Sequence, residues 1–474
     1  GPLQVLDRAP IIRPRREQVD RPRLSAIRTR LTANWGSAGA ISGPPQMKEP
    51  CRSRRVSAKA NAHRGDTATL LAAAPDDRRA IQHLKRAGFA EPAAALRNLH
   101  ALTPTPREAA LLAPALPRLL AALADAPDPD MALNNLERLA AQGEHVAFLR
   151  LITSHPGAIH LLARLGGTSQ FLADTLRRYP TLLPWLLEPR TMRQWLVDEL
   201  AADLAASLRA VDRPESRMNA LRRFKYRQLL RIGSRDILGD ADLTVTTEEL
   251  SHLADVCLAA AWDWTRARLE TLYGPPIGPD GEPTGLAVIG MGKLGGEELN
   301  YFSDIDPIFV YGEDGETAGG EAGRVANGEF FAQGVRGIVE ALESVTEEGH
   351  VFRVDLRLRP EGRSGALILS IAGYRAYFVD RAALWERQAL IKARAAAGDP
   401  AVAARFFEAV RPFVYRPGLD PAIVREVRGM KTQIDRSLRG KDAEHRNVKL
   451  GRGGIREVEF LVQALQLLYG GDDP

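Results

Sequence analysis

The stretch that decides the fold reads AVIGMGKLGGEELNYFSDIDPIFVY and spans residues 287–311. Its apolar start predicts a strand over 286–289, which leads into a loop rich in glycine. The loop contains Gly290, Gly292, Gly295 and Gly296. Glycine lets a backbone approach a phosphate and point N–H groups at it. We therefore expect a phosphate-binding loop, followed near 297–300 by a helix whose N-terminus faces an anion.

A glycine-rich loop is a weak signal by itself, and this one lacks the ending of a P-loop and the spacing of a dinucleotide fingerprint. The Ser303-Asp304-Ile305-Asp306 sequence strengthens it, because we expect a strand over 304–311. Residues two apart in a strand face the same side, so Asp304 and Asp306 project together. Neighbouring carboxylates repel each other unless a cation lies between them, and hard oxygen ligands suit Mg²⁺ or Mn²⁺.

A third segment, VFRVDLRLRP at 351–360, alternates apolar and charged residues. This alternation predicts a strand over 350–359 with its charged residues on one face. That face carries Arg353, Asp355, Arg357 and Arg359. A half-exposed strand can alternate in this way without any function. Beside the Asp304–Asp306 pair, however, the pattern indicates that Asp355 is a third metal carboxylate flanked by phosphate-binding arginines.

The rest of the chain is mostly helical in pattern. Apolar residues recur at three- and four-residue spacing from about 67 to 240, and they predict long helices over 217–238 and 247–272. Within the core we expect a helix over 328–342 and a last strand over 366–370, with helices again from 371 to the end. The expected fold class is α+β, mostly helical, with a small mixed sheet.

We divide the chain into four parts by composition and periodicity. The predicted parts are a basic, disordered extension over 1–65, a helical domain over 66–240, a catalytic core over 241–400 and a helical segment over 401–474.

The charge distribution argues against a nucleic-acid partner. Residues 1–65 contain 14 Lys and Arg against 4 Asp and Glu, whereas the whole chain carries only +5, so residues 66–474 carry −5. A basic arm of this kind is typically solvated. The two cysteines, Cys51 and Cys257, indicate no disulfide framework. No secretory signal or membrane span is expected, so the sequence predicts a cytoplasmic protein that binds no membrane.

The glycine loop, the Asp-x-Asp pair and a third acid resemble the polymerase-beta-like nucleotidyltransferase core. Gly292 stands in the glycine position of that pattern, whereas Lys293 departs from its usual Ser or Gly. The form GMGKLGG-E-ELN-SDID is similar to glutamine synthetase adenylyltransferase, where lysine is expected. Pro307 departs from the Leu that is common there. Four further segments agree, namely RQLLRIGSRDILG (227–239), VDLRLRPEGRSGAL (354–367), WERQALIKAR (385–394) and GRGGIREVEFLVQ (451–463).

The resemblance implies a function for this half of a two-core enzyme. The VDLRLRP, WERQALIKAR and GGIRE segments look like the N-terminal half, which removes AMP from a tyrosine of glutamine synthetase by phosphorolysis, and the C-terminal half adds it. The implied partners are adenylylated glutamine synthetase, phosphate and ADP, a uridylylated PII-type signal protein, and the C-terminal adenylylating half. The implied cofactor is Mg²⁺, with Mn²⁺ as a substitute.

The resemblance also implies roles for residues. Asp304, Asp306 and Asp355 are expected to be catalytic and to hold the metal. The residues expected to bind nucleotide or phosphate are Gly292, Lys293, Gly295, Gly296, Ser303, Arg357 and Arg359. Lys392 and Arg394, on a helix over 385–394, either face the site or form surface ion pairs, and Glu457 and Glu459 are expected to hold structure.

Three other functions remain open at this stage. The chain could transfer AMP from ATP onto glutamine synthetase, which is the reaction of the other half. It could extend RNA, with the basic arm as the RNA-binding element. It could also be a non-catalytic module that binds a PII-type protein, although the three carboxylates favour an enzyme.

Overall fold

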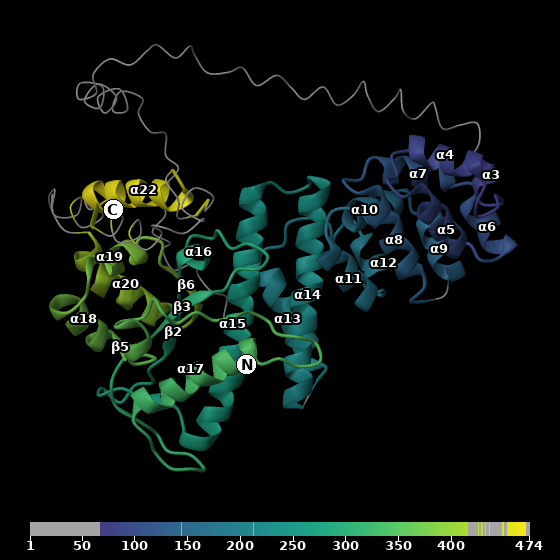
Figure 1. Cartoon of the computed structure of the whole chain (residues 1–474). Helices are drawn as coiled ribbons and strands as arrows, with labels where there is room; N and C mark the ends of the chain where they lie inside the picture. The colour runs from purple at the N-terminus through teal and green to yellow at the C-terminus, as the bar shows by residue number, and fades with distance from the viewer. Residues whose placement is uncertain are drawn as a thin grey trace, which may run out of the picture.

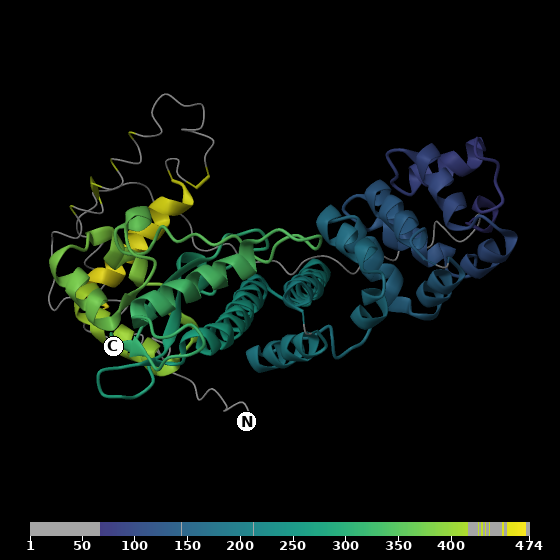
Figure 2. The same cartoon turned by 90° about the horizontal axis from the view of Figure 1, so that it is seen from below.

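The computed structural model describes residues 67–415 except 144 and 212, single residues between 425 and 449, and residues 453–470. The predicted extension over 1–65 lies outside the described residues, as does part of the predicted segment over 401–474. The described part is elongated, with N-terminal helices at one end and a small sheet at the other (Figures 1 and 2).

Short helices make up the N-terminal end. They are α3 (Thr67–Leu70), α4 (Arg78–Arg86), α5 (Pro92–Leu102), α6 (Pro106–Leu112), α7 (Leu116–Ala124), α8 (Pro129–Ala140), α9 (His145–Ser154), α10 (Pro156–Gly166), α11 (Gln170–Arg178) and α12 (Leu182–Leu186). Their starts follow ordinary capping rules, since Asp77, Asp128 and Ser169 accept backbone N–H groups of the first turn. Their apolar faces share one buried cluster rich in leucine.

Longer helices join this end to the sheet. They are α13 (Val197–Arg209), α14 (Pro214–Leu238) and α15 (Leu243–Tyr273). The predictions of helices over 217–238 and 247–272 are therefore confirmed. Helix α14 begins with a proline in its first turn and ends at Gly239, whose φ of 78° is one that glycine adopts readily. Helices α14 and α15 lie side by side between the two ends of the molecule (Figure 1).

A buried ionic cluster fastens α14 to α15. Glu249 is fully buried, and its carboxylate accepts hydrogen bonds from Arg235 and, at 3.1 Å, from the Trp195 backbone N–H. Arg231, also fully buried, lies 2.8 Å from the same carboxylate. Two buried cations therefore depend on one buried anion.

We expect Glu249→Ala to destabilise the fold by about 3 to 5 kcal/mol, because it leaves two buried guanidinium groups without a counterion. Urea denaturation followed by circular dichroism measures the change. Glu188→Ala is the matched control, because Glu188 pairs at 2.6 Å with an exposed arginine, Arg190, and its loss should cost less than about 1 kcal/mol. Equal costs for the two variants would show that the buried cluster does not hold the helices together.

The sheet at the other end has four strands in the order β5-β3-β2-β6. The strands are β2 (Leu286–Met291), β3 (Asp306–Tyr311), β5 (Leu369–Ser370) and β6 (Arg394–Gly398). Strand β2 is antiparallel to β3 and β6, whereas β3 is parallel to β5. The predicted fold class, mostly helical with a small mixed sheet, is confirmed.

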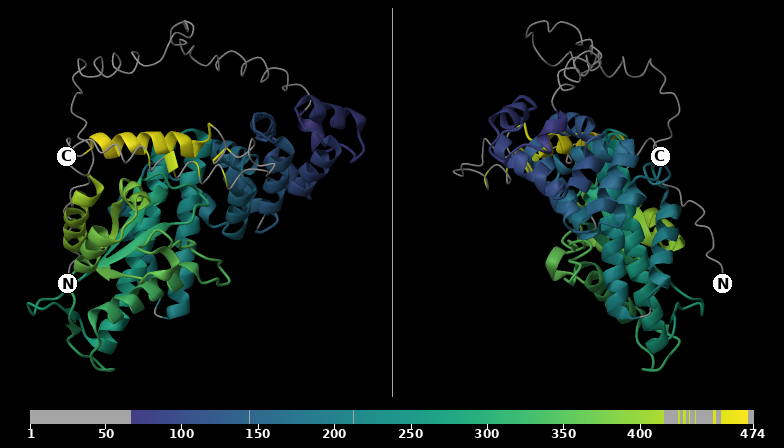
Figure 3. Two further views of the ribbon diagram at one scale, coloured as in Figure 1. Left: turned by 60° about the vertical axis from the view of Figure 1, so that its left-hand side comes forward. Right: turned by 90° about the vertical axis from the view of Figure 1, so that its right-hand side faces the viewer.

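Helices cover both faces of this sheet. Alternate residues of β2 enter two different buried clusters: Val288 packs with α15 and α17, and Ile289 with α18 and α20. This double burial explains why the strand reads as an unbroken apolar run. Figure 3 shows the sheet between the two sets of helices.

Other elements surround the sheet or extend from it. They are β1 (Pro276–Ile277), α16 (Gly292–Gly295), β4 (Glu316–Thr317), α17 (Asn327–Glu343), the 3-10 turn η1 (Gly362–Ser364), α18 (Ile371–Asp380), α19 (Leu384–Leu390), α20 (Pro400–Val414) and α22 (Ile455–Tyr469). Strands β1 and β4 pair with each other as a separate antiparallel ribbon. The predicted helix over 328–342 is confirmed as α17.

The expected strand over 350–359 and the expected all-helical C-terminal region are both wrong. Residues 350–359 form no strand; they make a single parallel bridge, between Val354 and Ile305. The chain after 371 is not wholly helical, because β6 pairs with β2, and β6 begins at Arg394, the last residue of the predicted helix 385–394. Helix α19 ends at Leu390, and the run of small residues after it fits a strand whose two sides face packed clusters.

In the described residues no single helix is long and apolar enough to cross a membrane. Helices α9 and α10 are long and apolar enough only when taken together, and they are bent by 112° relative to each other.

Candidate functional site

Two backbone hydrogen bonds of Ile305 organise the site. Its N–H donates to the carbonyl oxygen of Arg353 at 3.0 Å, and its carbonyl oxygen accepts the N–H of Asp355 at 2.8 Å. This short ladder places Asp355 alongside Asp304 and Asp306, which flank Ile305 in sequence. The structure therefore brings the three predicted carboxylates together, although strand β3 begins only at Asp306.

The ladder stops after one bridge because Asp355 closes a local turn. Its Oδ1 accepts the backbone N–H of Arg357 at 2.9 Å, so that N–H is not available to a neighbouring strand. On the other side, the N–H of Val354 donates to Glu343 Oε1 at 2.7 Å. These two contacts turn the expected strand into a loop, and they aim Asp355 back towards Ile305.

The three carboxylates have different partners. Asp304 Oδ1 accepts Nε of Arg353 at 2.6 Å, and both side chains are well exposed. Both oxygens of Asp355 accept Nε of Arg357, at 2.8 and 2.7 Å. These hydrogen bonds lower the pKa of Asp355 below its ordinary value.

Asp306 has the opposite electrostatic environment. Burial, and then the negative charges of Asp355 and Asp304, raise the pKa of Asp306 to about 6. The cluster thus concentrates more negative charge than its nearest cations compensate. An excess of negative charge of this kind increases the free energy gained when a divalent cation binds.

Asp306→Asn should make the metal-free protein more stable at pH 8, by about 1 to 2 kcal/mol. The raised pKa means that the folded protein holds this proton more tightly than the unfolded chain, so ionised Asp306 opposes folding above pH 6. The gain should shrink to a small fraction as the pH falls towards 4, where Asp306 is protonated in the folded protein and partly protonated in the unfolded chain. Urea unfolding in EDTA at pH 8 and pH 4 measures it.

Asp280→Asn serves as the control for this experiment. Asp280 is exposed in the 278–281 turn, and as asparagine it keeps the oxygen that accepts the Glu282 N–H. The difference in unfolding free energy between Asp280→Asn and the unchanged protein should be the same at both pH values. An Asp306→Asn variant that is less stable at pH 8 would contradict the electrostatic account.

The glycine loop packs directly against this cluster. Gly292 has a φ of +54°, and a Cβ at that position would lie 3.0 Å from Asp306 Oδ2. A Cβ at Gly295 would lie 2.1 Å from the carbonyl oxygen of Lys392 and 2.5 Å from that of Gly290. Close approach to a carboxylate and to two backbone segments therefore requires these two glycines.

The helix expected over 297–300 is absent, and that expectation is wrong. The helical turn is α16, which begins at Gly292 itself, and Glu297 then adopts a positive φ of 55°. A turn of four residues aligns too few peptide dipoles to act as an anion-binding helix N-terminus.

We expect Gly295→Ala to lower stability by about 1 to 3 kcal/mol, because its Cβ would overlap two backbone oxygens that cannot move away independently. Gly296→Ala is the matched neighbour, since its Cβ would meet only the flexible Glu298 side chain, at 3.1 Å. Thermal unfolding of both variants tests the contrast. Similar melting temperatures would show that the loop is not packed as closely as described.

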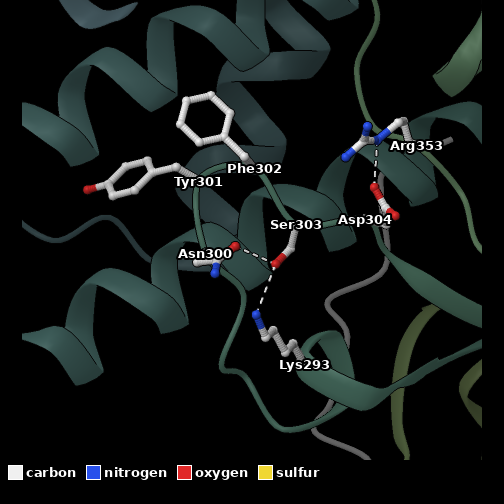
Figure 4. A pocket seen from close by; sticks show the side chains of 7 residues that line it. All are labelled: Lys293, Asn300, Tyr301, Phe302, Ser303, Asp304 and Arg353. Atoms are coloured by element: carbon white, nitrogen blue, oxygen red, sulfur yellow. Dashed lines mark hydrogen bonds and ion pairs between the residues drawn. The ribbon is translucent and has the colours of Figure 1, made fainter. Parts of the chain in front are cut away.

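An open pocket of about 530 Å³ lies beside the carboxylates. It is lined by Lys293, Asn300, Tyr301, Phe302, Ser303, Asp304 and Arg353 (Figure 4). Lys293 Nζ lies 3.5 Å from Ser303 Oγ, and the Ser303 hydroxyl donates to Asn300 Oδ1. The predicted phosphate-binding residues Lys293 and Ser303 therefore share one pocket with a metal-binding candidate.

Helices far away in sequence hold the walls of this pocket. The Tyr301 hydroxyl donates to Asp236 of α14 at 2.7 Å, and Phe302 packs edge-on against Phe171 of α11, with ring centroids 5.1 Å apart. Sequence reasoning missed Asn300, Tyr301 and Phe302 as pocket residues. The available signal was their position directly before Ser303.

The loop that leads to Asp355 is held in the same way. Buried Arg222 of α14 donates to the carbonyl oxygen of Gly349 at 2.7 Å and to that of Ser344. Glu348 accepts hydrogen bonds from Tyr179 and, at 3.1 Å, from Arg223. Both carboxylate-bearing segments are thus anchored to the helices before the core.

Arg359 is not directed at the carboxylates. Its guanidinium donates to the carbonyl oxygens of Leu356 at 2.8 Å, Arg363 at 3.1 Å and Gly365 at 3.3 Å. It holds the loop around η1, which gives no support to its predicted role in phosphate binding.

Lys392 and Arg394 do not lie on a helix, because α19 ends before them. Arg394 belongs to β6; it bonds both oxygens of Asp255, at 2.7 and 3.1 Å, and donates to the carbonyl oxygen of Leu294 at 3.1 Å. Lys392 Nζ lies 2.7 Å from Glu298. Both basic residues therefore bond to the glycine loop or to the residues that follow it. Glu459 lies 3.6 Å from Lys392, and Glu457 accepts the N–H of Gly453 at 3.1 Å.

The donor set suits a hard divalent cation, but two ion pairs compete with it. Within the described part of the chain, no three Asp, Glu, His or Cys side chains are arranged as they stand to hold a metal ion. Arg353 forms an ion pair with Asp304, and Arg357 forms one with Asp355. The two arginine side chains are 67% and 64% exposed, so they can turn away into solvent. The three aspartates then offer the oxygen ligands that Mg²⁺ or Mn²⁺ prefers.

The mixed sheet, the glycine loop and the carboxylate cluster define a nucleotidyltransferase-type fold. Residues 159–409, more than half of the chain, match the family described as glutamate-ammonia ligase adenylyltransferase. The chain belongs to this family. Residues 428–473 also match the PII-uridylyltransferase family, although many of these residues lie outside those described.

Relatives with similar sequences carry the name bifunctional glutamine synthetase adenylyltransferase/adenylyl-removing enzyme. The relative from Pseudomonas putida is 43% identical over 312 residues, which are 65% of this chain and 32% of that protein. The relative from Shewanella loihica is 40% identical over 313 residues, or 66% and 32% of the two chains. The match thus spans about a third of the length of these curated relatives.

Proposed function

We propose that this chain is the adenylyl-removing half of a glutamine synthetase adenylyltransferase. The reaction is phosphorolysis, in which adenylyl-tyrosine and phosphate give tyrosine and ADP. The observation that carries the proposal is the gathering of Asp304, Asp306 and Asp355 around Ile305, beside a pocket that contains Lys293, in a member of this family. The VDLRLRP, WERQALIKAR and GGIRE segments support the choice of the N-terminal half.

The proposed chemistry transfers one adenylyl group from the tyrosine oxygen to an oxygen of phosphate. An oxygen of inorganic phosphate attacks the α-phosphorus of the adenylyl group, and the new P–O bond forms ADP. The bond from phosphorus to the tyrosine oxygen breaks, and the phenolate takes a proton from solvent. Lys293 and Ser303 bind phosphoryl oxygens and orient them. Asp304, Asp306 and Asp355 would hold Mg²⁺ or Mn²⁺, which supplies charge stabilisation at the transferring group.

The proposal includes several partners, of which the relatives' name mentions only glutamine synthetase. The protein substrate is adenylylated glutamine synthetase, and the small-molecule partners are phosphate and ADP. A PII-type signal protein in its uridylylated form would activate the reaction, and an adenylylating core would stand in the same full-length protein. No nucleic acid or membrane takes part.

The direct test is release of ADP from adenylylated glutamine synthetase by this chain, with Mg²⁺ and uridylylated signal protein present. ADP that forms only with both phosphate and metal would support the proposal. Consumption of ATP with adenylylation of unmodified glutamine synthetase would instead identify the adding half. Binding of the signal protein without either reaction would favour a regulatory module, and extension of RNA would favour a tailing enzyme.

Asp304→Asn and Asp355→Asn should each reduce the rate of ADP release by about 100-fold or more, because each removes one anionic metal ligand while keeping the side-chain shape. Circular dichroism should show an unchanged fold. Asp280→Asn, in the exposed turn over 278–281, should keep full activity. Full activity in either site variant would exclude the proposed metal ligands.

A further inference from the structure

The cations of the pocket suggest how metal and phosphate binding are coupled. We propose that Arg353 is a phosphate-binding residue that is held on Asp304 until a divalent cation displaces it, so that metal binding releases a guanidinium for inorganic phosphate. The inference rests on the proposed phosphorolysis, because it assigns the binding site of the attacking phosphate. The sequence pattern placed Arg353 on the charged face with Asp355, and the structure adds its bond to Asp304 and its position in the pocket.

The geometry separates a fixed backbone from a movable side chain. The carbonyl oxygen of Arg353 accepts the Ile305 N–H at 3.0 Å, so the position of its backbone is set by the same ladder that aligns the carboxylates. Its side chain is 67% exposed and is bonded to Asp304 at 2.6 Å. The guanidinium can therefore exchange partners without any change in the fold.

The position of the pair favours phosphate as the second partner. Figure 4 shows the bonded Arg353 and Asp304 in the same pocket as Lys293 and Ser303, with Ser303 between Lys293 and Asp304. The pocket thus contains two cations and one carboxylate. If a metal ion binds the Asp304 carboxylate, the side chains of Lys293 and Arg353 are left in the pocket without a neighbouring anion. A phosphate dianion matches their charge, and its oxygens can accept two hydrogen bonds from one planar guanidinium.

The other arginines of the segment are less suited to this role. Arg357 donates through its Nε to both oxygens of Asp355, and its backbone N–H donates to Oδ1. Arg359 is used by the carbonyl oxygens of its own loop. Neither lines the pocket. The sequence predicted phosphate binding by Arg357 and Arg359, and we assign this role to Arg353 instead.

The proposal predicts two effects of Arg353→Gln with opposite signs. Without phosphate, Mn²⁺ should bind about two to five times more tightly than to the unchanged chain, because the cation no longer competes with an exposed ion pair. The probe is free Mn²⁺, followed by its electron paramagnetic resonance signal. In saturating Mg²⁺, inorganic phosphate should bind about tenfold or more weakly in equilibrium dialysis, because a charge-assisted contact is lost. Arg353→Lys should bind phosphate with intermediate affinity, since it keeps the charge without the planar fork.

Arg381→Gln is the matched control. Arg381 pairs with Glu361 at 2.8 Å, and the two side chains are 63% and 46% exposed, close to the values for Arg353 and Asp304. This pair does not line the pocket. Its loss should change neither the Mn²⁺ nor the phosphate affinity.

Weaker Mn²⁺ binding by Arg353→Gln would overturn the proposal, because it would mean that Arg353 only orients Asp304. Unchanged phosphate affinity in Mg²⁺ would overturn it as well. Both measurements are made without turnover, so they remain informative if no ADP is released from glutamine synthetase. In that case opposite shifts would still support the coupled phosphate site, and the proposed substrate alone would fail. ADP release with neither shift would support the function and reject the role of Arg353.

Discussion

The candidate site depends on the two backbone hydrogen bonds of Ile305. The Ile305 side chain is fully buried in the cluster between the sheet and the long helices, so its backbone has little freedom to move. Backbone groups in such a position need partners, and here both come from the segment 353–355. Two carboxylates next to Ile305 in sequence and a third from far along the chain are consequently held together at one point.

This arrangement has an energetic cost that the protein reduces locally. Three carboxylates in close proximity repel one another, and the raised pKa of Asp306 reports that repulsion together with burial. Arg353 and Arg357 offset part of it by pairing with the two outer aspartates. Exposed ion pairs are weak and exchange partners easily, so this compensation does not prevent a stronger cation from binding.

The helices before the core contribute to the site as much as the sheet does. Helix α14 holds Tyr301 through Asp236 and holds the loop before Arg353 through Arg222, and α11 supports Phe302 through Phe171. These contacts connect the helical end of the molecule with both carboxylate-bearing segments. A change in the packing of those helices would therefore alter the distance between the carboxylates, which gives the helical region a physical means of influencing the site.

Elements with local signals could be predicted from the sequence alone. The buried run of β2, the periodicity of α14, α15 and α17, and the Asp-x-Asp spacing all lie within short windows, where period and residue type are sufficient. The tertiary structure decided what depends on distant partners. Residues 353–359 alternate like a strand, yet only one residue has a neighbour to pair with, and Asp355 takes the next N–H for its own turn. Residues 394–398 look helical but pair with β2, because an open strand edge lies beside them. The bonding partners of Arg353, Arg359 and Arg394 have the same cause: a side chain's partner is set by which segments meet in space, and sequence spacing carries no information about that meeting.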